Sequence, residues 1–126
     1  MKITTFNPMI LSPKADEAIK LFEELGFEKK HAPVVETGKG QVRSIRMKNA
    51  DGFHIDIADV KSMPQDKTII RMNVDNFDEA YDMLEAKGFT HSGGKKAVET
   101  ESNKSAMMTS PSGFAFDLCQ HIKEHN

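Results

Sequence analysis

Two aspartates occupy matching places in two similar stretches of the sequence. Asp56 lies in the run FHIDIADV and Asp117 lies in the run GFAFDLCQ. Because side chains alternate between the two faces of a strand, each aspartate points away from the face that its apolar neighbours share. Two carboxylates close together repel each other, and the pKa of one rises unless a cation intervenes. The pair therefore suggests acid–base chemistry or a positively charged partner.

Basic and amide side chains are candidates to complete this chemistry. Arg71 is a candidate partner for either aspartate, and a salt bridge that only stabilises the fold is the alternative. His54 shares a strand face with Asp56 and has the pKa of a base near neutral pH, although a lone histidine on a sheet is more often only hydrogen-bonded or solvated. Arg46 is a candidate to recognise an anion. The predicted ligand-binding residues are Asn7, Met9, Arg46, His54, Asp56, Arg71 and Asp117.

A duplicated segment must position these residues. The stretch DEAIKLFEELGF at 16–27 returns as DEAYDMLEAKGF at 78–89, and six of the twelve positions are identical. Such a repeat indicates two copies of one supersecondary unit. Each copy predicts the order β-α-β-β-β, with the second strand the least well defined. The expected strands lie at about 3–11, 41–48 and 53–60 in the first copy, and at 68–74, within 91–105 and on both sides of the 110–113 turn in the second.

Local signals mark the ends of the two helices. Ser12 is expected to cap the first helix, with Pro13 in its first turn, where the missing N–H costs nothing. Gly26 and Gly88 are expected to end the helices. The predicted apolar stripes are Ala18, Leu21, Phe22 and Leu25 in the first helix and Ala80, Met83 and Leu84 in the second, and the predicted cap of the second helix is Asn76 or Asp75.

The two faces of each predicted sheet differ in composition. A helix covers only one face, so apolar side chains are expected there. The opposite face mixes carboxylate, arginine, histidine and asparagine with methionine and leucine, as in a small-molecule pocket, and the alternative is a solvated sheet face. Residues expected on the helix side are Ile10, Phe53, Ile55 and Ile57 in one copy and Met72, Phe114, Phe116 and Leu118 in the other.

Composition excludes several classes of protein. The 126 residues suit one domain, and 17 basic against 19 acidic residues give a net charge of -2, without the basic footprint of a nucleic-acid-binding protein. No apolar run approaches the roughly 20 residues that cross a bilayer, and the start of the sequence shows no secretory signal. The lone Cys119 forms no internal disulfide and is expected to be a small buried thiol. We expect a cytoplasmic protein that binds neither membrane nor nucleic acid.

The tandem repeat resembles the vicinal oxygen chelate superfamily, which includes glyoxalase I, extradiol dioxygenases and bleomycin-resistance proteins. Its marks here are helices ending in Leu-Gly-Phe or Lys-Gly-Phe and hairpins turning at Asp-Gly-Phe or Ser-Gly-Phe. The resemblance implies an α+β fold in which two tandem β-α-β-β-β modules form a curved mixed sheet cup with the helices outside. It also implies one domain over 1–126, with module 1 at about 1–61 and module 2 at about 66–122.

The same resemblance locates the metal ligands of metal-dependent members. Those places fall here on Asn7, Asp56, Ile69 and Asp117. Isoleucine offers no lone pair, and aspartate is one methylene shorter than the usual glutamate. No cofactor is therefore expected, and the alternative is a divalent ion held by Asp56 and Asp117 with water.

Two functions follow as hypotheses. The first is a cytoplasmic small-molecule-binding protein of the glyoxalase or bleomycin-resistance type without the usual metal ligands. The second is a divalent-metal-dependent lyase, isomerase or dioxygenase-like enzyme, so whether the chain is catalytic stays open. A homodimer is expected only from the resemblance, because no helix is predicted to expose an apolar face. The Gly93–Lys96 stretch is interpreted as a loop over the cup mouth or simply as a solvated loop.

Overall fold

The computed structural model describes residues 1–31, 34–37, 40–91, 98–99 and 103–121. The chain divides into two compact units, and each is described by itself. The first unit is Asn7–Thr68, and the second unit combines Met1–Phe6 with Ile69–Asn126. The predicted loop at Gly93–Lys96 lies outside the described residues.

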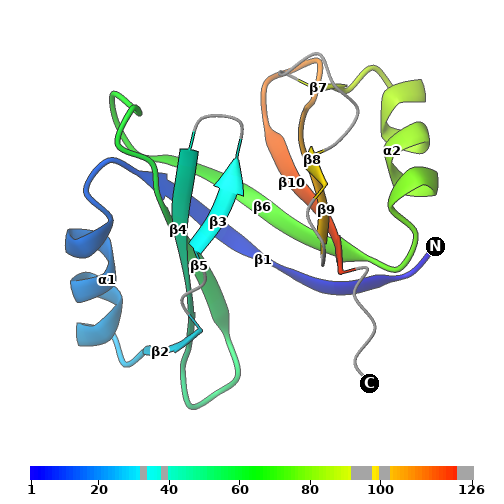
Figure 1. Ribbon diagram of the computed structural model, residues 1–126. Helices are drawn as coiled ribbons and strands as arrows, with labels where there is room; N and C mark the ends of the chain where they lie inside the picture. The colour runs from blue at the N-terminus through cyan, green and yellow to red at the C-terminus, as the bar shows by residue number, and fades with distance from the viewer. Residues whose placement is uncertain (32–33, 38–39, 92–97, 100–102, 122–126) are drawn as a thin grey trace. The chain divides into compact units, whose positions relative to one another are not determined.

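The first unit contains one helix and a mixed sheet (Figure 1). Its central strand β5 pairs in parallel with β1 and antiparallel with β4. Both β2 and β3 pair with β4, so together they form one interrupted edge strand. In chain order the elements are β1 (Ile3–Ser12), α1 (Ala15–Glu24), β2 (Glu28–His31), β3 (Val34–Thr37), β4 (Gly40–Lys48) and β5 (His54–Asp59).

The second unit repeats this arrangement. Strand β10 pairs in parallel with β6 and antiparallel with β9, and β7 and β8 both pair with β9. The α+β class and the order β-α-β-β-β in each module are therefore confirmed, with the second strand of each module broken in two. The elements are β6 (Lys67–Val74), α2 (Phe77–Ala86), β7 (Thr90–His91), β8 (Val98–Glu99), β9 (Asn103–Thr109) and β10 (Ala115–His121).

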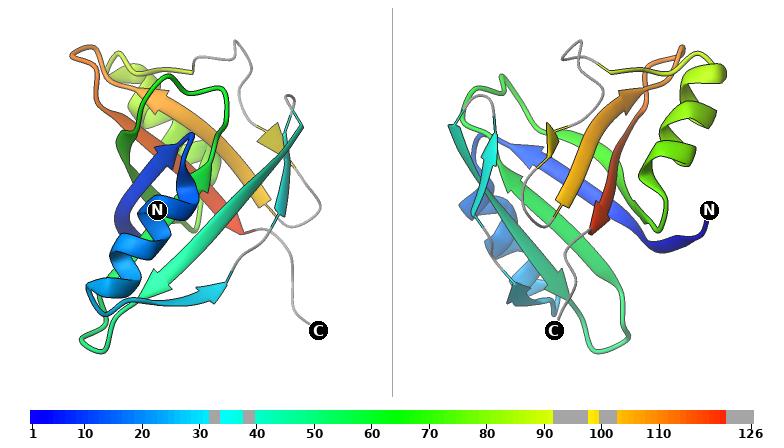
Figure 2. Two further views of the ribbon diagram at one scale, coloured as in Figure 1. Left: turned by 90° about the vertical axis from the view of Figure 1, so that its left-hand side faces the viewer. Right: turned by 45° about the vertical axis from the view of Figure 1, so that its right-hand side comes forward.

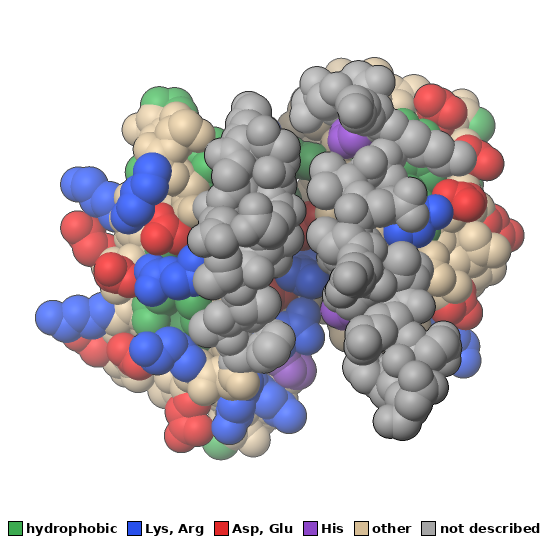
Figure 3. Space-filling model, viewed as in Figure 1, with side chains coloured by type: hydrophobic (Ala, Val, Ile, Leu, Met, Phe, Trp, Pro, Cys, Tyr) green, Lys and Arg blue, Asp and Glu red, His purple; other side chains and the backbone are tan. Residues whose placement is uncertain are grey.

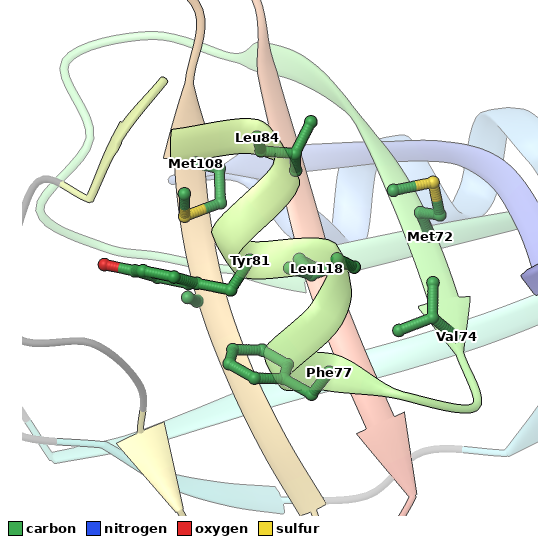
Figure 4. Packing of buried hydrophobic residues seen from close by; sticks show 9 residues of the cluster. Met72, Val74, Phe77, Tyr81, Leu84, Met108 and Leu118 are labelled. Atoms are coloured by element: carbon green, nitrogen blue, oxygen red, sulfur yellow. The ribbon is translucent and has the colours of Figure 1, made fainter. Parts of the chain in front are cut away.

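Each helix lies against one face of its own strands (Figure 2), and a hydrophobic core lies between the helix and those strands. Around α2 the core is built on Phe77, which is fully buried together with Met108 and Leu118 (Figure 4). In the core around α1, Ala15 stands at the position that Phe77 has in the repeat. The buried members are Ala15, Ile19, Ile45, Met47, Ile55 and Ile57 in the first unit and Met72, Val74, Phe77, Ala80, Tyr81, Leu84, Ala106, Met108 and Leu118 in the second.

The helix ends agree only in part with prediction. Gly26 and Gly88 follow the helices with φ of 101° and 95°, which confirms both as the left-handed residues that end them. Asn76 caps α2, since its side chain accepts from the Glu79 N–H at 3.1 Å. The predicted start of α1 was wrong, because the helix begins at Ala15 and its cap residue makes no side-chain cap.

Ser12 is used in another way. Its hydroxyl accepts from the Lys14 N–H at 3.0 Å and lies 2.6 Å from a carboxylate oxygen of Asp66. The hydroxyl therefore stabilises the turn before α1. Its hydrogen bond with Asp66 also links the segment after β5 to the end of β1. A serine before a proline signalled a change of direction correctly, but the helix starts at Ala15, two residues after the predicted Pro13.

The predicted rotation of both helices was partly wrong. Ala18 and Phe22 do pack against the first core, but Leu21 and Leu25 are exposed, with 61% of Leu25 accessible to solvent. The true buried line of α1 is Ala15, Ile19 and Phe22, which also follows helical spacing. Met83, the repeat partner of Leu21, is exposed too. The expectation that no helix exposes apolar side chains was therefore also wrong.

The predicted core position of Phe53 was wrong, because this side chain is 66% exposed at the turn before β5. Phe114 is exposed too, but it lies on the predicted side of the sheet, since its ring contacts Phe89 and Phe116, which pack against the core around α2. Both phenylalanines directly follow a turn glycine with positive φ, Gly52 or Gly113. Ile10, Ile55, Ile57, Met72, Phe116 and Leu118 do pack with the cores as predicted.

Among the described residues, no helix is long and apolar enough to cross a membrane.

Candidate functional site

Asp56 is the centre of a polar cluster in the first unit. Its side chain is 2% exposed, and both carboxylate oxygens have donors. Arg46 approaches with two nitrogens, Nε at 3.1 Å from Oδ1 and Nη2 at 3.2 Å from Oδ2. The Asn7 amide donates to Oδ2 at 2.8 Å. A buried carboxylate needs such compensation, because an isolated charge in the protein interior is very costly.

Strand pairing places Arg46 and Met9 on the two sides of Asp56. Arg46 lies directly across from Asp56 in the β4–β5 hairpin, and Met9 lies beside Asp56 on β1. Cross-strand partners place their side chains on the same face of a sheet. That face is opposite α1, because the alternate residues Ile45, Met47, Ile55 and Ile57 belong to the core.

His54 and Lys48 continue the same face. They are cross-strand partners one step from the Arg46–Asp56 pair, nearer the hairpin turn. His54 is half-buried and Lys48 is exposed. Among the predicted residues, the structure thus gathers Asn7, Met9, Arg46, His54 and Asp56 on one sheet face of the first unit.

The second unit holds the remaining predicted residues. Asp117 has Arg71 beside it on β6 and Met107 across from it on β9. The thiol of Cys119 donates to Asp117 Oδ1 at a sulfur–oxygen distance of 3.4 Å. Cys119 is buried, which confirms the small buried thiol. Asp117 therefore occupies the register position of Asp56, with a different set of neighbours.

These faces are not solvated sheet surfaces at their centres. Polar and apolar side chains alike are buried there. The buried residues on the face opposite the helix are Asn7, Met9, Leu11, Ser44, Asp56 and Ala58 in the first unit and Ile69, Asn73, Ala115 and Cys119 in the second.

Three of the four residues at the family's metal positions have features that disfavour a metal ion. Asp56 is already paired with the forked guanidinium of Arg46, which both takes its oxygens and repels a second cation. Asn7 directs its amide nitrogen, not its oxygen, at Asp56. Ile69 is a buried hydrocarbon. Among the described residues there is also no group of three or more His, Cys, Asp or Glu side chains that could hold a metal ion.

Sequence reasoning named Arg71 as the partner of the aspartates and gave Arg46 only a role toward anions. The signal for the Arg46–Asp56 pair was present in the hairpin turn. The Asn49 N–H bonds to the Phe53 carbonyl at 3.0 Å, so counting back along both strands from this pair brings Arg46 opposite Asp56. The position of the turn fixes the register of a hairpin, and the register determines which residues are cross-strand partners.

Comparison with known proteins identifies the architecture. No family model matches the sequence, and no curated protein sequence matches it. Solved structures do match. Methylmalonyl-CoA epimerase from Mycobacterium tuberculosis has a TM-score of 0.70 at 14% identity, covering 96% of this chain and 90% of that one.

Two further structures agree. A glyoxalase/bleomycin resistance protein/dioxygenase superfamily member from Vibrio splendidus 12B01 has a TM-score of 0.57 at 16% identity, covering 96% of this chain and all of that one. Glyoxalase I from Zea mays has a TM-score of 0.67 at 11% identity, covering 98% of this chain but only 45% of the maize protein. At such identities the likeness shows the fold alone, and this chain has the vicinal oxygen chelate fold.

Proposed function

We propose that the chain is a cytoplasmic small-molecule-binding protein of the glyoxalase/bleomycin-resistance type, in which residues 1–126 form one domain and no metal ion takes part in binding. One observation carries the proposal. The carboxylate of Asp56, at a position where metal-dependent relatives have a ligand, is buried and held by the guanidinium of Arg46. A side-chain cation thus takes the place that a metal ion would need.

The sheet faces opposite the helices support a binding role. They bury methionine, leucine and alanine side chains beside asparagine and aspartate. Small-molecule sites have this composition, with few polar groups in apolar surroundings. Proteins of the same fold include glyoxalase I and methylmalonyl-CoA epimerase. Asn7, Met9, Arg46 and His54 in the first unit, and Arg71 and Asp117 in the second, are the proposed ligand-binding residues.

Ligand binding is tested by thermal unfolding of the purified protein against a broad set of amphiphilic and aromatic compounds. A ligand present at 100 times its Kd stabilises the folded state by about 2.7 kcal/mol, which is a clear shift in Tm. Hits should keep their affinity in a chelator. If no compound raises the Tm, a small-molecule-binding role is wrong.

A metal-dependent enzyme is the second candidate. It is favoured by the matched register positions of Asp56 and Asp117, both carboxylates and both at places of family metal ligands. Elemental analysis after purification without chelators decides between the two. Stoichiometric Ni, Zn, Mn, Fe or Mg, or a raised Tm when one of these ions is added, would favour the enzyme and contradict the first proposal.

A further inference from the structure

We propose that Arg46 is an oxyanion-binding residue that gives the site its specificity, so that the ligand carries a carboxylate or phosphate group. The inference rests on the proposed binding function and names its ligand class. It starts from the uneven burial of the Arg46–Asp56 pair, in which the arginine side chain is 27% exposed and the aspartate side chain only 2%.

Because of this uneven burial, one end of the ion pair faces the protein interior and the other end faces outward. The carboxylate is the inner end, sealed by Arg46 and Asn7, and the guanidinium is the outer end. An approaching molecule therefore meets the cation, although the pair is neutral as a whole. A low surrounding dielectric strengthens such an interaction with an anion compared with one in water.

Asp56 also fixes the orientation of the guanidinium. It takes Nε and Nη2, the two nitrogens along one side of the planar fork. The guanidinium carries five N–H donors in a rigid plane, so the nitrogen Nη1 is held in a set direction by the same contact. An arginine that is already ordered loses less entropy when an oxyanion binds, and planar oxyanions suit its geometry.

The neighbouring charges favour an anion. Lys48 and His54 share the sheet face of Arg46. Glu28, a carboxylate across from Lys48 on β2, is itself paired with Lys30 at 3.3 Å. Figure 3 shows Lys, Arg and His side chains next to one another on the lower part of this view, where the first unit ends. Within the described part of this face, basic groups outnumber carboxylates.

The test compares three probes with a common phenyl ring: benzoate, the neutral benzamide, which has nearly the same shape as benzoate, and the larger phenyl phosphate. Affinities are measured by titration calorimetry, and the site is located from backbone amide shifts in NMR. We expect benzoate or phenyl phosphate to bind about tenfold or more tightly than benzamide, because a charge-assisted hydrogen bond is lost in the amide. The largest shifts should fall on β4 and β5. The stronger of the two anions identifies the oxyanion.

Two variants make the test specific. Arg46→Met combined with Asp56→Asn removes the pair without leaving a buried unpaired charge, and should lose the preference for the anions. Arg43→Met is the matched control, since it removes the same charge from the same strand, where Arg43 pairs with Asp16 on α1 at 2.7 Å. The control should keep the preference.

The outcomes separate the two proposals. Benzamide binding as tightly as the anions, or Arg43→Met losing as much preference as the double variant, would overturn the oxyanion site while leaving small-molecule binding in place. If no probe and no compound of the broader set binds the unmodified chain, the proposed function fails together with the inference.

Discussion

Each unit places an arginine beside its strand aspartate, but the arginine comes from a different neighbouring strand in each. Asp56 and Asp117 hold the same register position, and each has one arginine and one methionine as cross-strand neighbours. In the first unit the arginine is on the antiparallel neighbour β4 and Met9 is on the parallel neighbour β1. In the second unit Arg71 is on the parallel neighbour β6 and Met107 is on the antiparallel neighbour β9.

The two copies of the repeat share one feature and differ in another. Both have an arginine beside the aspartate, but the strand that carries the arginine differs between the copies. The other contacts of the carboxylate differ accordingly, with the Asn7 amide on Asp56 and the Cys119 thiol on Asp117. An amide is a stronger hydrogen-bond donor than a thiol, so these two contacts differ in strength.

The helices differ in a similar way. Phe77 begins α2 and is fully buried, whereas its repeat partner Ala15 begins α1. Two leucines of α1, Leu21 and Leu25, are exposed. The first unit is thus distinguished by the polar cluster around Asp56, and the second unit by the fully buried aromatic side chain of Phe77.

The largest effect is expected at the aromatic core. Phe77→Ala makes the start of α2 equal to that of α1 and should lower the free energy of unfolding by about 3–5 kcal/mol, because a large buried side chain is lost and a cavity remains. Urea denaturation measures the change. Met83→Ala, on the exposed side of the same helix, is the control and should change stability by no more than about 0.5 kcal/mol. Equal losses in both variants would contradict the core described here.

The Arg46–Asp56 pair comes next. Arg46→Met reproduces the methionine found at position 107 but leaves Asp56 buried without its cation, which should cost about 3 kcal/mol of unfolding free energy. Adding Asp56→Asn should recover most of this loss in the same urea experiment. No recovery would mean that Arg46 acts through packing alone.

Moving the arginine tests the comparison directly. Arg46→Met combined with Met9→Arg gives the first unit the arrangement of the second, and should recover about 1–2 kcal/mol relative to Arg46→Met alone, less any overpacking at the buried Met9. Stability is followed by urea denaturation. A double variant no more stable than the single one would show that the two sides of Asp56 are not equivalent.

A smaller effect is expected at the helix caps. Asn76→Ala removes the side chain that accepts from the Glu79 N–H and should cost about 1 kcal/mol. Lys14, the cap residue of α1, makes no side-chain cap, so Lys14→Ala should cost much less. Thermal unfolding of the two variants side by side measures the difference. Equal effects would contradict the assignment of Asn76 as a cap.

The smallest effect concerns pH. Burial lowers the pKa of His91 below its ordinary 6.5, so the unfolded chain binds the proton more readily and stability falls as pH drops through 6.5. The repeat partner of His91 is the exposed Lys29. The stability of the unmodified chain relative to His91→Gln should decrease between pH 7.5 and 5.5, measured by urea denaturation. Lys29→Gln should show no such trend, and a flat difference for His91→Gln would rule out this cause.

The sequence by itself determined the duplicated β-α-β-β-β order, both hairpin turns, the C-terminal end of both helices and the sheet face on which each aspartate lies. All of these depend on neighbours within a few residues. Strand alternation, a glycine of positive φ and helical spacing act locally and leave a regular pattern. Even the partner of Asp56 was implied by the turn at Asn49–Gly52, because a hairpin fixes its own register.

Only the tertiary structure decided the remaining features. The rotation of α1, which exposes Leu21 and Leu25, depends on how a helix docks on a sheet formed by distant strands. The exposure of Phe53 depends on where the strands begin to pair. The hydrogen bond from the Asn7 amide to the Asp56 carboxylate joins residues that are 49 positions apart in the sequence. Several local patterns were compatible with each of these outcomes, and the choice between them was made by long-range packing and by the need to compensate a buried charge.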